Sequence, residues 1–220
     1  MVIPALLAVA ALLALAPIAL LLSRSPFGRP VAYGASLALA LVLAAAAAAS
    51  LFGHHDSAIT LPLGLPWLGA HFRIDALSAF FLIVVNVGAA AASLFAIGYG
   101  RHEEHPQRVL PFYPAYLAAM NLVLLSADAF SFLVSWEFMS LSSWALVMAN
   151  HREQDNTRAG YIYLIMASFG TLALLLAFGL LAGPDGGYGF AAIRADAHSP
   201  VIAGLVLALV LLGAGSKAGV

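Results

Sequence analysis

The sequence contains no cysteine, which excludes disulfide bonds, cysteine-ligated iron–sulfur clusters and thiol chemistry from these 220 residues. It also lacks the CxxC and HExxH spacings of common metal sites, and its seven histidines are scattered through the predicted loops. His54, His55 and Asp56 are adjacent, but neighbouring side chains rarely point at one centre. We therefore assign the chain no metal and no cofactor.

Charge is also scarce. Only 9% of the residues are charged, whereas a soluble domain carries roughly 25%. By contrast, 63% are hydrophobic and the mean hydropathy is +0.99. The net charge is -1 and no basic block is present, so nothing indicates a nucleic-acid partner. The composition predicts an integral membrane protein, with the lipid bilayer as its surroundings.

The apolar runs are long enough to cross a bilayer, which takes a helix of roughly 20 residues. The first run, MVIPALLAVAALLALAPIALLLSR, has no basic start and is too long for a typical secretory signal, so we interpret it as a membrane helix. Runs such as LALALVLAAAAAAS lack the period-two alternation of a membrane β-barrel. The predicted fold class is therefore an all-α polytopic transmembrane bundle of about seven helices, at 2–22, 31–52, 76–98, 111–127, 129–149, 159–182 and from 201 to the end.

The arginines in the loops predict the orientation, because cytoplasmic loops carry an excess of Lys and Arg. The odd-numbered loops hold six arginines and the even-numbered loops hold two. We therefore place the odd loops in the cytoplasm and the N-terminus outside. The six are Arg24, Arg29, Arg101, Arg108, Arg152 and Arg158, and the two are Arg73 and Arg194.

Three connections have recognisable patterns. The second loop, GHHDSAITLPLGLPWLGAHFRID, predicts a short extracytoplasmic hairpin over the bundle. The junction at 126–128 is so tight that the helices on either side must be antiparallel neighbours. In the sixth loop, FAAIRADA favours either a surface connector or a short interfacial helix.

Glu137 is an acid inside a predicted span. It lies about nine residues, or roughly 13 Å, beyond Asp128, close to the bilayer midplane. Desolvation favours the neutral form of such a carboxyl, so the group can exchange protons. Ser140 and Trp144 share its helix face, and Ser143 lies nearby. The alternative is a permanent helix–helix hydrogen bond, but Gln or Ser would make one at lower cost.

Lys217 is the corresponding base. It follows Gly213 and Gly215, which weaken a helix and let other backbones approach, as in the discontinuous helices of transporters. Alternatively it snorkels to the cytoplasmic end, since it lies about 27 Å along a straight helix from Ser199. These residues leave both interpretations open. His151, just beyond the fifth span, is either an accessory proton carrier or a solvated loop histidine.

Three runs, SAFFLIVVNVG, SWEFMSLSSWALV and LLGAGSKAG, resemble a known family. They look like the antiporter-like, proton-translocating subunits of respiratory complex I, multi-subunit sodium/proton antiporters and membrane-bound hydrogenases. The likeness is strongest to component B of hydrogenase-4 and formate hydrogenlyase complexes, with their WEFMSL-like and G-x-G-[ST]-K-A-G runs. It extends over about residues 70–220.

The resemblance implies that Glu137 and Lys217 are an essential pair whose separation modulates the proton affinity of the lysine. It implies two parts, a two-helix segment with its loop at 1–75 and the start of the proton-conducting domain at 76–220. Because the family generally has a second, inverted repeat, we expect the first half of that fold, in an N-terminal fragment. Some relatives carry a basic residue in the sixth helix. Here that helix offers only hydroxyls such as Tyr163 and Thr171, and a tyrosine near a helix start more often marks the membrane interface.

The expected function is that of a proton-translocating subunit of a redox-driven complex, either NADH:quinone oxidoreductase-like or hydrogenase-4-like. It would lie in the bacterial cytoplasmic membrane beside other membrane subunits. We expect no redox catalysis in this chain, although it could share the enzyme name of its complex. One alternative is a sodium/proton antiporter subunit. Another, from a different class, is a truncated, non-conducting structural or assembly subunit.

Overall fold

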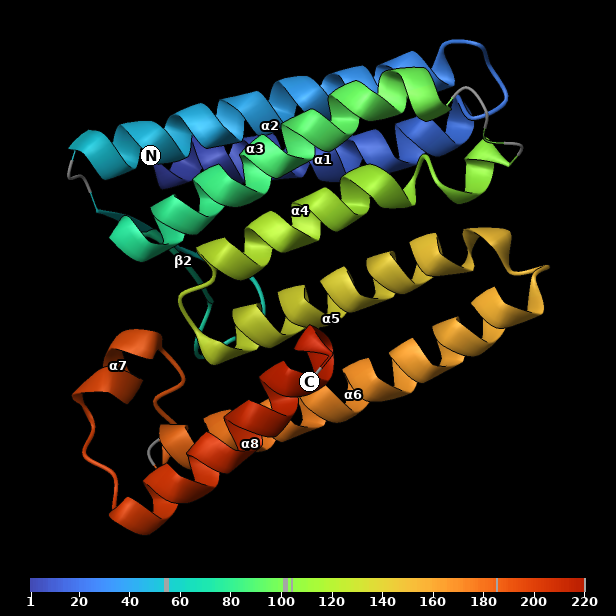
Figure 1. Cartoon of the computed structure of the whole chain (residues 1–220). Helices are drawn as coiled ribbons and strands as arrows, with labels where there is room; N and C mark the ends of the chain where they lie inside the picture. The colour runs from blue at the N-terminus through green and yellow to red at the C-terminus, as the bar shows by residue number, and fades with distance from the viewer. Residues whose placement is uncertain (54–55, 101–102, 104, 185, 220) are drawn as a thin grey trace.

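The computed structural model describes residues 1–53, 56–100, 103, 105–184 and 186–219. Within these ranges seven helices are long and apolar enough to cross a membrane, which confirms the predicted all-α polytopic bundle. They are joined by a two-stranded hairpin and a short helix (Figure 1). The helices are α1 (Val2–Leu21), α2 (Gly28–Gly53), α3 (Ala76–Tyr99), α4 (Phe112–Leu125), α5 (Ala129–Val147), α6 (Gln154–Ala182), α7 (Phe190–Ala195) and α8 (Pro200–Ala218); the strands are β1 (Ser57–Leu61) and β2 (Ala70–Ile74).

The largest boundary difference is in α6, which begins at Gln154 and not near residue 159 as predicted. Its first turns are polar and contain Asp155, whose charge favours a helix N-terminus. A hydropathy criterion detects only the part of a helix that is apolar, so it misses a polar extension of this kind. The helix therefore continues beyond its apolar run.

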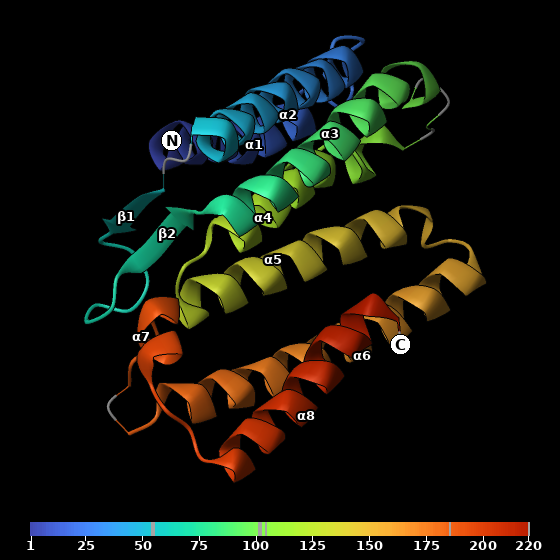
Figure 2. The same cartoon turned by 60° about the vertical axis from the view of Figure 1, so that its left-hand side comes forward.

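The helices form two packed groups (Figures 1 and 2). Helices α1 to α4 share an apolar core that includes Leu12, Leu43 and Leu82. Inside this group Asn86 of α3 donates a hydrogen bond of 2.7 Å to the side-chain oxygen of Asn121 on α4, so two buried amides satisfy each other. Helix α5 packs against α4 on one side and α6 on the other, and α8 packs on α6. Helix α5 therefore connects the two groups.

The second loop forms the predicted hairpin, with an antiparallel register from Ser57 opposite Ile74 to Leu61 opposite Ala70. Asp128 fastens it to the bundle. The buried carboxylate of Asp128 caps α5 by accepting a hydrogen bond of 2.7 Å from the Ser131 amide, and it accepts another of 2.7 Å from the His71 amide. The tight α4–α5 junction therefore also anchors β2.

The start of α7 is also bound to the α4–α5 junction, because the amide of Phe190 donates to the carbonyl of Ala127 over 3.0 Å. The segment expected to be a connector or an interfacial helix contains α7. Its Phe190 ring stacks on Phe178 and packs edge-on against Phe132, with ring centres 5.7 and 6.1 Å apart. The helix is therefore held to α5 and α6 by aromatic contacts.

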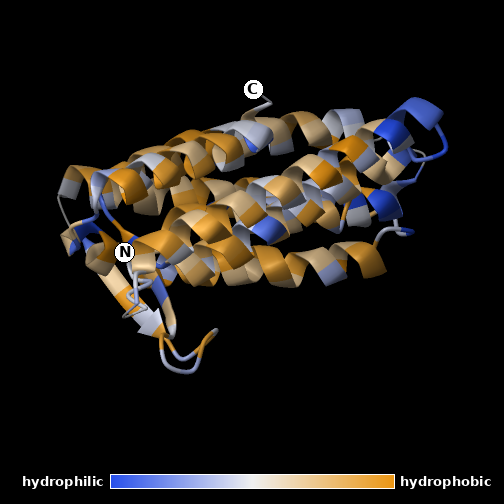
Figure 3. Cartoon of the chain, turned by 90° about the horizontal axis from the view of Figure 1, so that it is seen from below, coloured by the Kyte–Doolittle hydropathy of each residue, from blue (hydrophilic) through white to orange (hydrophobic). Residues whose placement is uncertain are grey.

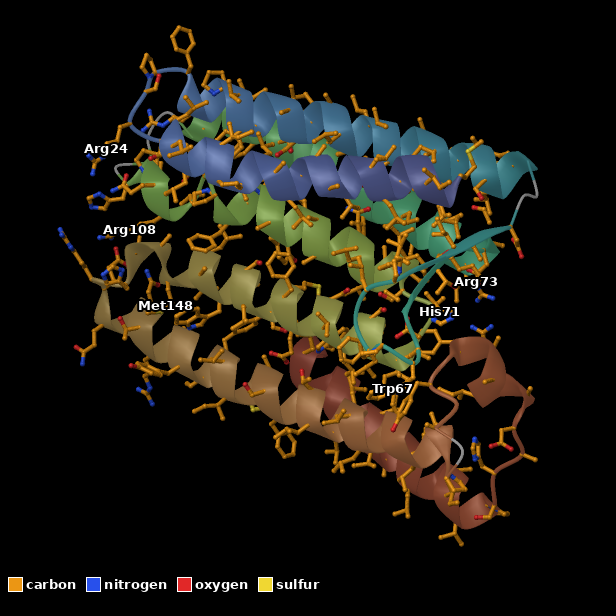
Figure 4. All side chains as sticks on the ribbon, turned by 180° about the vertical axis from the view of Figure 1, so that it is seen from behind. Arg24, Trp67, His71, Arg73, Arg108 and Met148 are labelled. Carbon is orange, nitrogen blue, oxygen red and sulfur yellow. The ribbon has the colours of Figure 1, made fainter. Side chains whose placement is uncertain are left out.

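The charged loops lie at opposite ends of the bundle. Figure 4 shows Arg24 and Arg108 at one end and His71 and Arg73 at the other. Apolar residues dominate the helices between the ends, as Figure 3 shows. The odd and even loops are thus separated as the predicted topology requires. Of the residues used in the sequence analysis, His54, His55 and Arg101 lie outside the described part.

Candidate functional site

Glu137 is half-buried in the middle of α5, on the side that faces α6. Its carboxyl Oε1 accepts a hydrogen bond from the hydroxyl of Thr171 on α6. The same hydroxyl lies 3.1 Å from the carbonyl of Ala167, one turn earlier in α6. The single hydroxyl proton is therefore shared between a helix carbonyl and the carboxyl of Glu137.

Lys217 lies at the end of α8 but in the interior of the bundle. Its Nζ donates hydrogen bonds to Ser140 Oγ on α5, at 2.8 Å, and to the Tyr163 hydroxyl on α6, at 2.5 Å. It also lies 4.8 Å from the centre of the Tyr163 ring and 5.9 Å from that of Trp136. Tyr163 is about 13 Å along α6 from Gln154. The ammonium group thus contacts mid-helix side chains and does not reach a loop, as a snorkelling lysine would.

The acid and the base are connected indirectly. In the described residues, Glu137 and Lys217 form no ion pair within 4.0 Å. Ser140, which binds Lys217, is one helical turn beyond Glu137 on α5. On α6, Thr171 binds the acid and Tyr163 the base. The two charged groups therefore contact different hydroxyls of the same helix and do not contact each other directly.

Two glycines bring α8 close enough for these contacts. A Cβ added at Gly170 of α6 would meet the hydroxyl of Ser216 and lie 2.8 Å from the carbonyl of Gly213. One added at Gly213 would lie 2.9 Å from the carbonyl of Gly170. The predicted close backbone approach is confirmed, but α8 runs unbroken through its glycines, so the discontinuous helix is not found. Gly213 lies one turn before Lys217, so this crossing positions the lysine.

The remaining accessory candidates lie elsewhere. Ser143 is half-buried and makes no hydrogen bond to another described residue. Trp144 lines an apolar groove of about 630 Å³ between α1, α4 and α5. His151 is exposed after α5, with its Nδ1 3.2 Å from the carbonyl of Met148. Of the four accessory positions predicted from the sequence, only Ser140 contacts either charge. Across the described ranges, no three His, Asp or Glu side chains gather into a candidate metal site.

Tyr163 and Thr171 are the contacts that sequence reasoning missed. Tyr163 was expected at the membrane interface because the predicted span began near residue 159. Since α6 begins at Gln154, Tyr163 lies more than two turns inside the helix. The polar residues from Gln154 onward were the available signal that α6 begins before its apolar run. Neither hydroxyl residue has a local pattern that identifies its partner.

Comparison with known proteins gives a family match in the part of the chain that holds this site. Residues 126–220 match the family described as NADH:quinone oxidoreductase/Mrp antiporter, TM. The matched region includes α5, α6 and α8, and with them Glu137 and Lys217.

The chain is similar to hydrogenase-4 component B from Escherichia coli strain K12, with 35% identity over 149 residues that cover 67% of this chain and 22% of that protein. It is 27% identical over 227 residues to NADH-quinone oxidoreductase subunit N from Geobacillus kaustophilus, which covers 99% of this chain and 43% of the relative. Among solved structures, the Mrp complex from Dietzia sp. DQ12-45-1b contains a chain that is 25% identical and superposes with a TM-score of 0.80, over 97% of this chain and 23% of that one. The chain spans less than half the length of each of these proteins.

Proposed function

We infer the function of this chain from one premise: through residues 126–220 it belongs to the transmembrane family of NADH:quinone oxidoreductase and Mrp antiporter subunits. It is a multi-pass, antiporter-like membrane subunit. We propose that it translocates protons by way of Glu137 and Lys217. The observation that carries the proposal is the meeting of both side chains with hydroxyls of α6 inside the bundle.

The charge on either group can affect the proton affinity of the other. A carboxylate near an ammonium group stabilises its charged form, and loss of that neighbour lets desolvation favour the neutral amine. A shift of α8 along α6 would change the distance from Lys217 to Glu137. The lysine would then hold a proton in one arrangement and release it in the other.

Hydroxyl groups of α5 and α6 hold the two charged side chains in position. Ser140, Tyr163 and Thr171 can each donate and accept a hydrogen bond. Ser140 accepts from Lys217 while it donates to the carbonyl of Trp136 over 2.9 Å, so its orientation is fixed by its own helix. These side chains hold the acid and the base at separate points of one hydroxyl-lined interface.

The setting that this role requires is a larger complex in the bacterial cytoplasmic membrane, with other membrane subunits as neighbours. Hydrogenase-4 and NADH-quinone oxidoreductase, whose subunits are similar to this chain, support a redox-driven assembly. Electron transfer would then occur in other subunits, and this chain would use the energy to move protons. The excess of arginines in the odd-numbered loops supports an extracytoplasmic N-terminus.

Replacement of the buried acid tests the proposal. Glu137→Gln in the full-length protein should sharply lower proton pumping in reconstituted vesicles and leave assembly of the complex intact. Glu153→Gln is the matched control, since Glu153 is an exposed carboxylate before α6 and its loss should leave pumping unchanged. Wild-type pumping by Glu137→Gln would exclude the assignment.

Similarity to the Mrp complex favours a second candidate, a sodium/proton antiporter subunit. Sodium prefers oxygen ligands, and the Glu137 carboxyl and the Thr171 hydroxyl supply two. Vesicle pH changes measured with and without a sodium gradient distinguish the two functions. Proton movement that needs no sodium supports the redox-driven pump, and movement that requires sodium supports the antiporter.

A further inference from the structure

A small cavity of about 200 Å³ opens at the hairpin end of the bundle, away from Glu137 and Lys217. Strand β2 and helices α3, α4, α5 and α7 all contribute to its wall. Figure 4 shows Arg73 at this end, opposite Arg24 and Arg108. The lining combines two arginines and an aspartate with large apolar side chains, and the residues that matter here are Arg73, Asp75, Leu77, Phe81, Phe190 and Arg194.

The polar part of the cavity carries an excess of positive charge. Arg73 Nη2 donates to Asp75 Oδ2 over 2.6 Å. The other oxygen of Asp75 accepts from the Ser78 amide over 2.9 Å as the N-cap of α3, so both oxygens of this carboxylate are hydrogen-bonded. Arg194 is exposed and makes no hydrogen bond or ion pair with another described residue. Two guanidinium groups therefore face the cavity with one carboxylate between them.

Both arginines stabilise the ionised form of the Asp75 carboxyl group. Burial alone would raise the pKa of Asp75, but hydrogen bonds from Ser78 and the charges of Arg73 and Arg194 bring it below its ordinary value. Even so, a single carboxylate balances only one of the two cations.

The apolar part of the cavity leads away from the arginines along α3. Leu77 and Phe81 are four residues apart and share one helix face, with 68% and 45% of their surfaces exposed. Phe190 of α7 also lines the cavity. A ligand in this position would meet charge at the end of the bundle and hydrocarbon towards its middle, as a phospholipid does.

We propose that this cavity binds an anionic phospholipid, with its phosphate between Arg73 and Arg194 and an acyl chain along Leu77 and Phe81. A guanidinium group presents paired N–H donors that match phosphate oxygens. Arg73 precedes α3 by only a few residues and therefore lies at the level of the lipid headgroups. A choline headgroup brings a cation of its own towards the arginines, so the site should prefer phosphatidylglycerol. This proposal does not depend on proton translocation.

Native mass spectrometry of the full-length protein in detergent tests the site, with phosphatidylglycerol and phosphatidylcholine titrated separately. We expect tighter binding of phosphatidylglycerol, weakened about fivefold by Arg194→Gln and further by Arg73→Gln/Arg194→Gln. Arg194→Lys keeps the charge and should retain most of the binding. Arg24→Gln, which removes an exposed arginine at the opposite end, should change nothing.

Three results would overturn the proposal. The first is equal affinity for the two lipids, and the second is an unchanged affinity in Arg194→Gln. The third is displacement of phosphatidylglycerol by an equal concentration of inorganic phosphate, which would show an anion site without a role for the acyl chain. Arg194 is exposed and makes no hydrogen bond or close ion pair with a described residue, so its replacement removes a guanidinium group from the cavity without breaking a contact of either kind.

Discussion

Lys217 and Ser140 join the end of α8 to the middle of α5 through a hydrogen bond of 2.8 Å. The residues are 77 positions apart in the chain. Ser140 is completely buried and lies one turn from Glu137, so this bond brings the base to the helix that carries the acid. The candidate proton site therefore depends on where α8 crosses α6.

The hydroxyl of Thr171 is the contact that holds Glu137. Thr171→Val removes this hydroxyl with little change of shape, and the half-buried carboxyl then lacks its partner. We expect proton pumping in vesicles to fall roughly tenfold, as a loss of about 1–2 kcal/mol for a buried group left without its hydrogen-bond partner implies. Thr171→Ser keeps the hydroxyl and should restore most of the rate. Full pumping by the valine variant would show that the bond has no functional role.

The close contact between α6 and α8 predicts a difference between two glycines of one helix. Gly170→Ala introduces a Cβ against α8, whereas the Cβ of Gly179→Ala would meet no described atom within 4 Å apart from the adjacent backbone of its own helix. Both gain the same helix propensity, so only the clash separates them. We expect the free energy of unfolding in detergent to be about 1–3 kcal/mol lower for Gly170→Ala than for Gly179→Ala. Equal stabilities would contradict the close packing.

Asp75 predicts how stability changes in acid. Its folded-state pKa lies below the ordinary value because Ser78 and the two arginines favour the carboxylate. Its contribution is therefore complete above the ordinary pKa and disappears as the pH falls through the folded-state value. Asp75→Asn should flatten the acid limb of a stability–pH curve, while Asp196→Asn, at an exposed aspartate, should not. An unchanged acid limb in Asp75→Asn would exclude this linkage.

The absence of cysteine makes the predicted orientation easy to measure. Trp67 is 78% exposed at the hairpin end and Arg24 is exposed at the other. We expect Trp67→Cys to react with a membrane-impermeant maleimide in intact spheroplasts, and Arg24→Cys to react only after permeabilisation. The reverse labelling pattern would place the N-terminus in the cytoplasm.

The architecture was largely predictable because it follows from local composition. Long apolar runs identify the helices, and the turn-rich loop before α3 indicates the hairpin. The position of Glu137 in the middle of α5 followed from counting residues after Asp128, since a helix has a fixed rise. These features require information from only one segment at a time.

The contacts of the site were less predictable because they depend on distant segments. The location of Lys217 depends on the meeting of Gly170 with Gly213, and no spacing along the chain encodes that crossing. Tyr163 and Thr171 were visible as hydroxyls in a predicted helix, but their partners belong to α8 and α5. The sequence therefore indicated which groups are unusual, and the helix packing shows which neighbours each one contacts.

The central claim is that Glu137 and Lys217 act as one unit. Its most direct test is the rate of proton pumping in vesicles that contain the full-length protein as wild type, Glu137→Gln, Lys217→Ala or the double variant. Groups that act together have non-additive effects. We predict that each single variant loses most of the rate. The double variant should pump no more slowly than the single variant that has the lower rate. Losses that multiply in the double variant, or a wild-type rate in either single variant, would contradict the account.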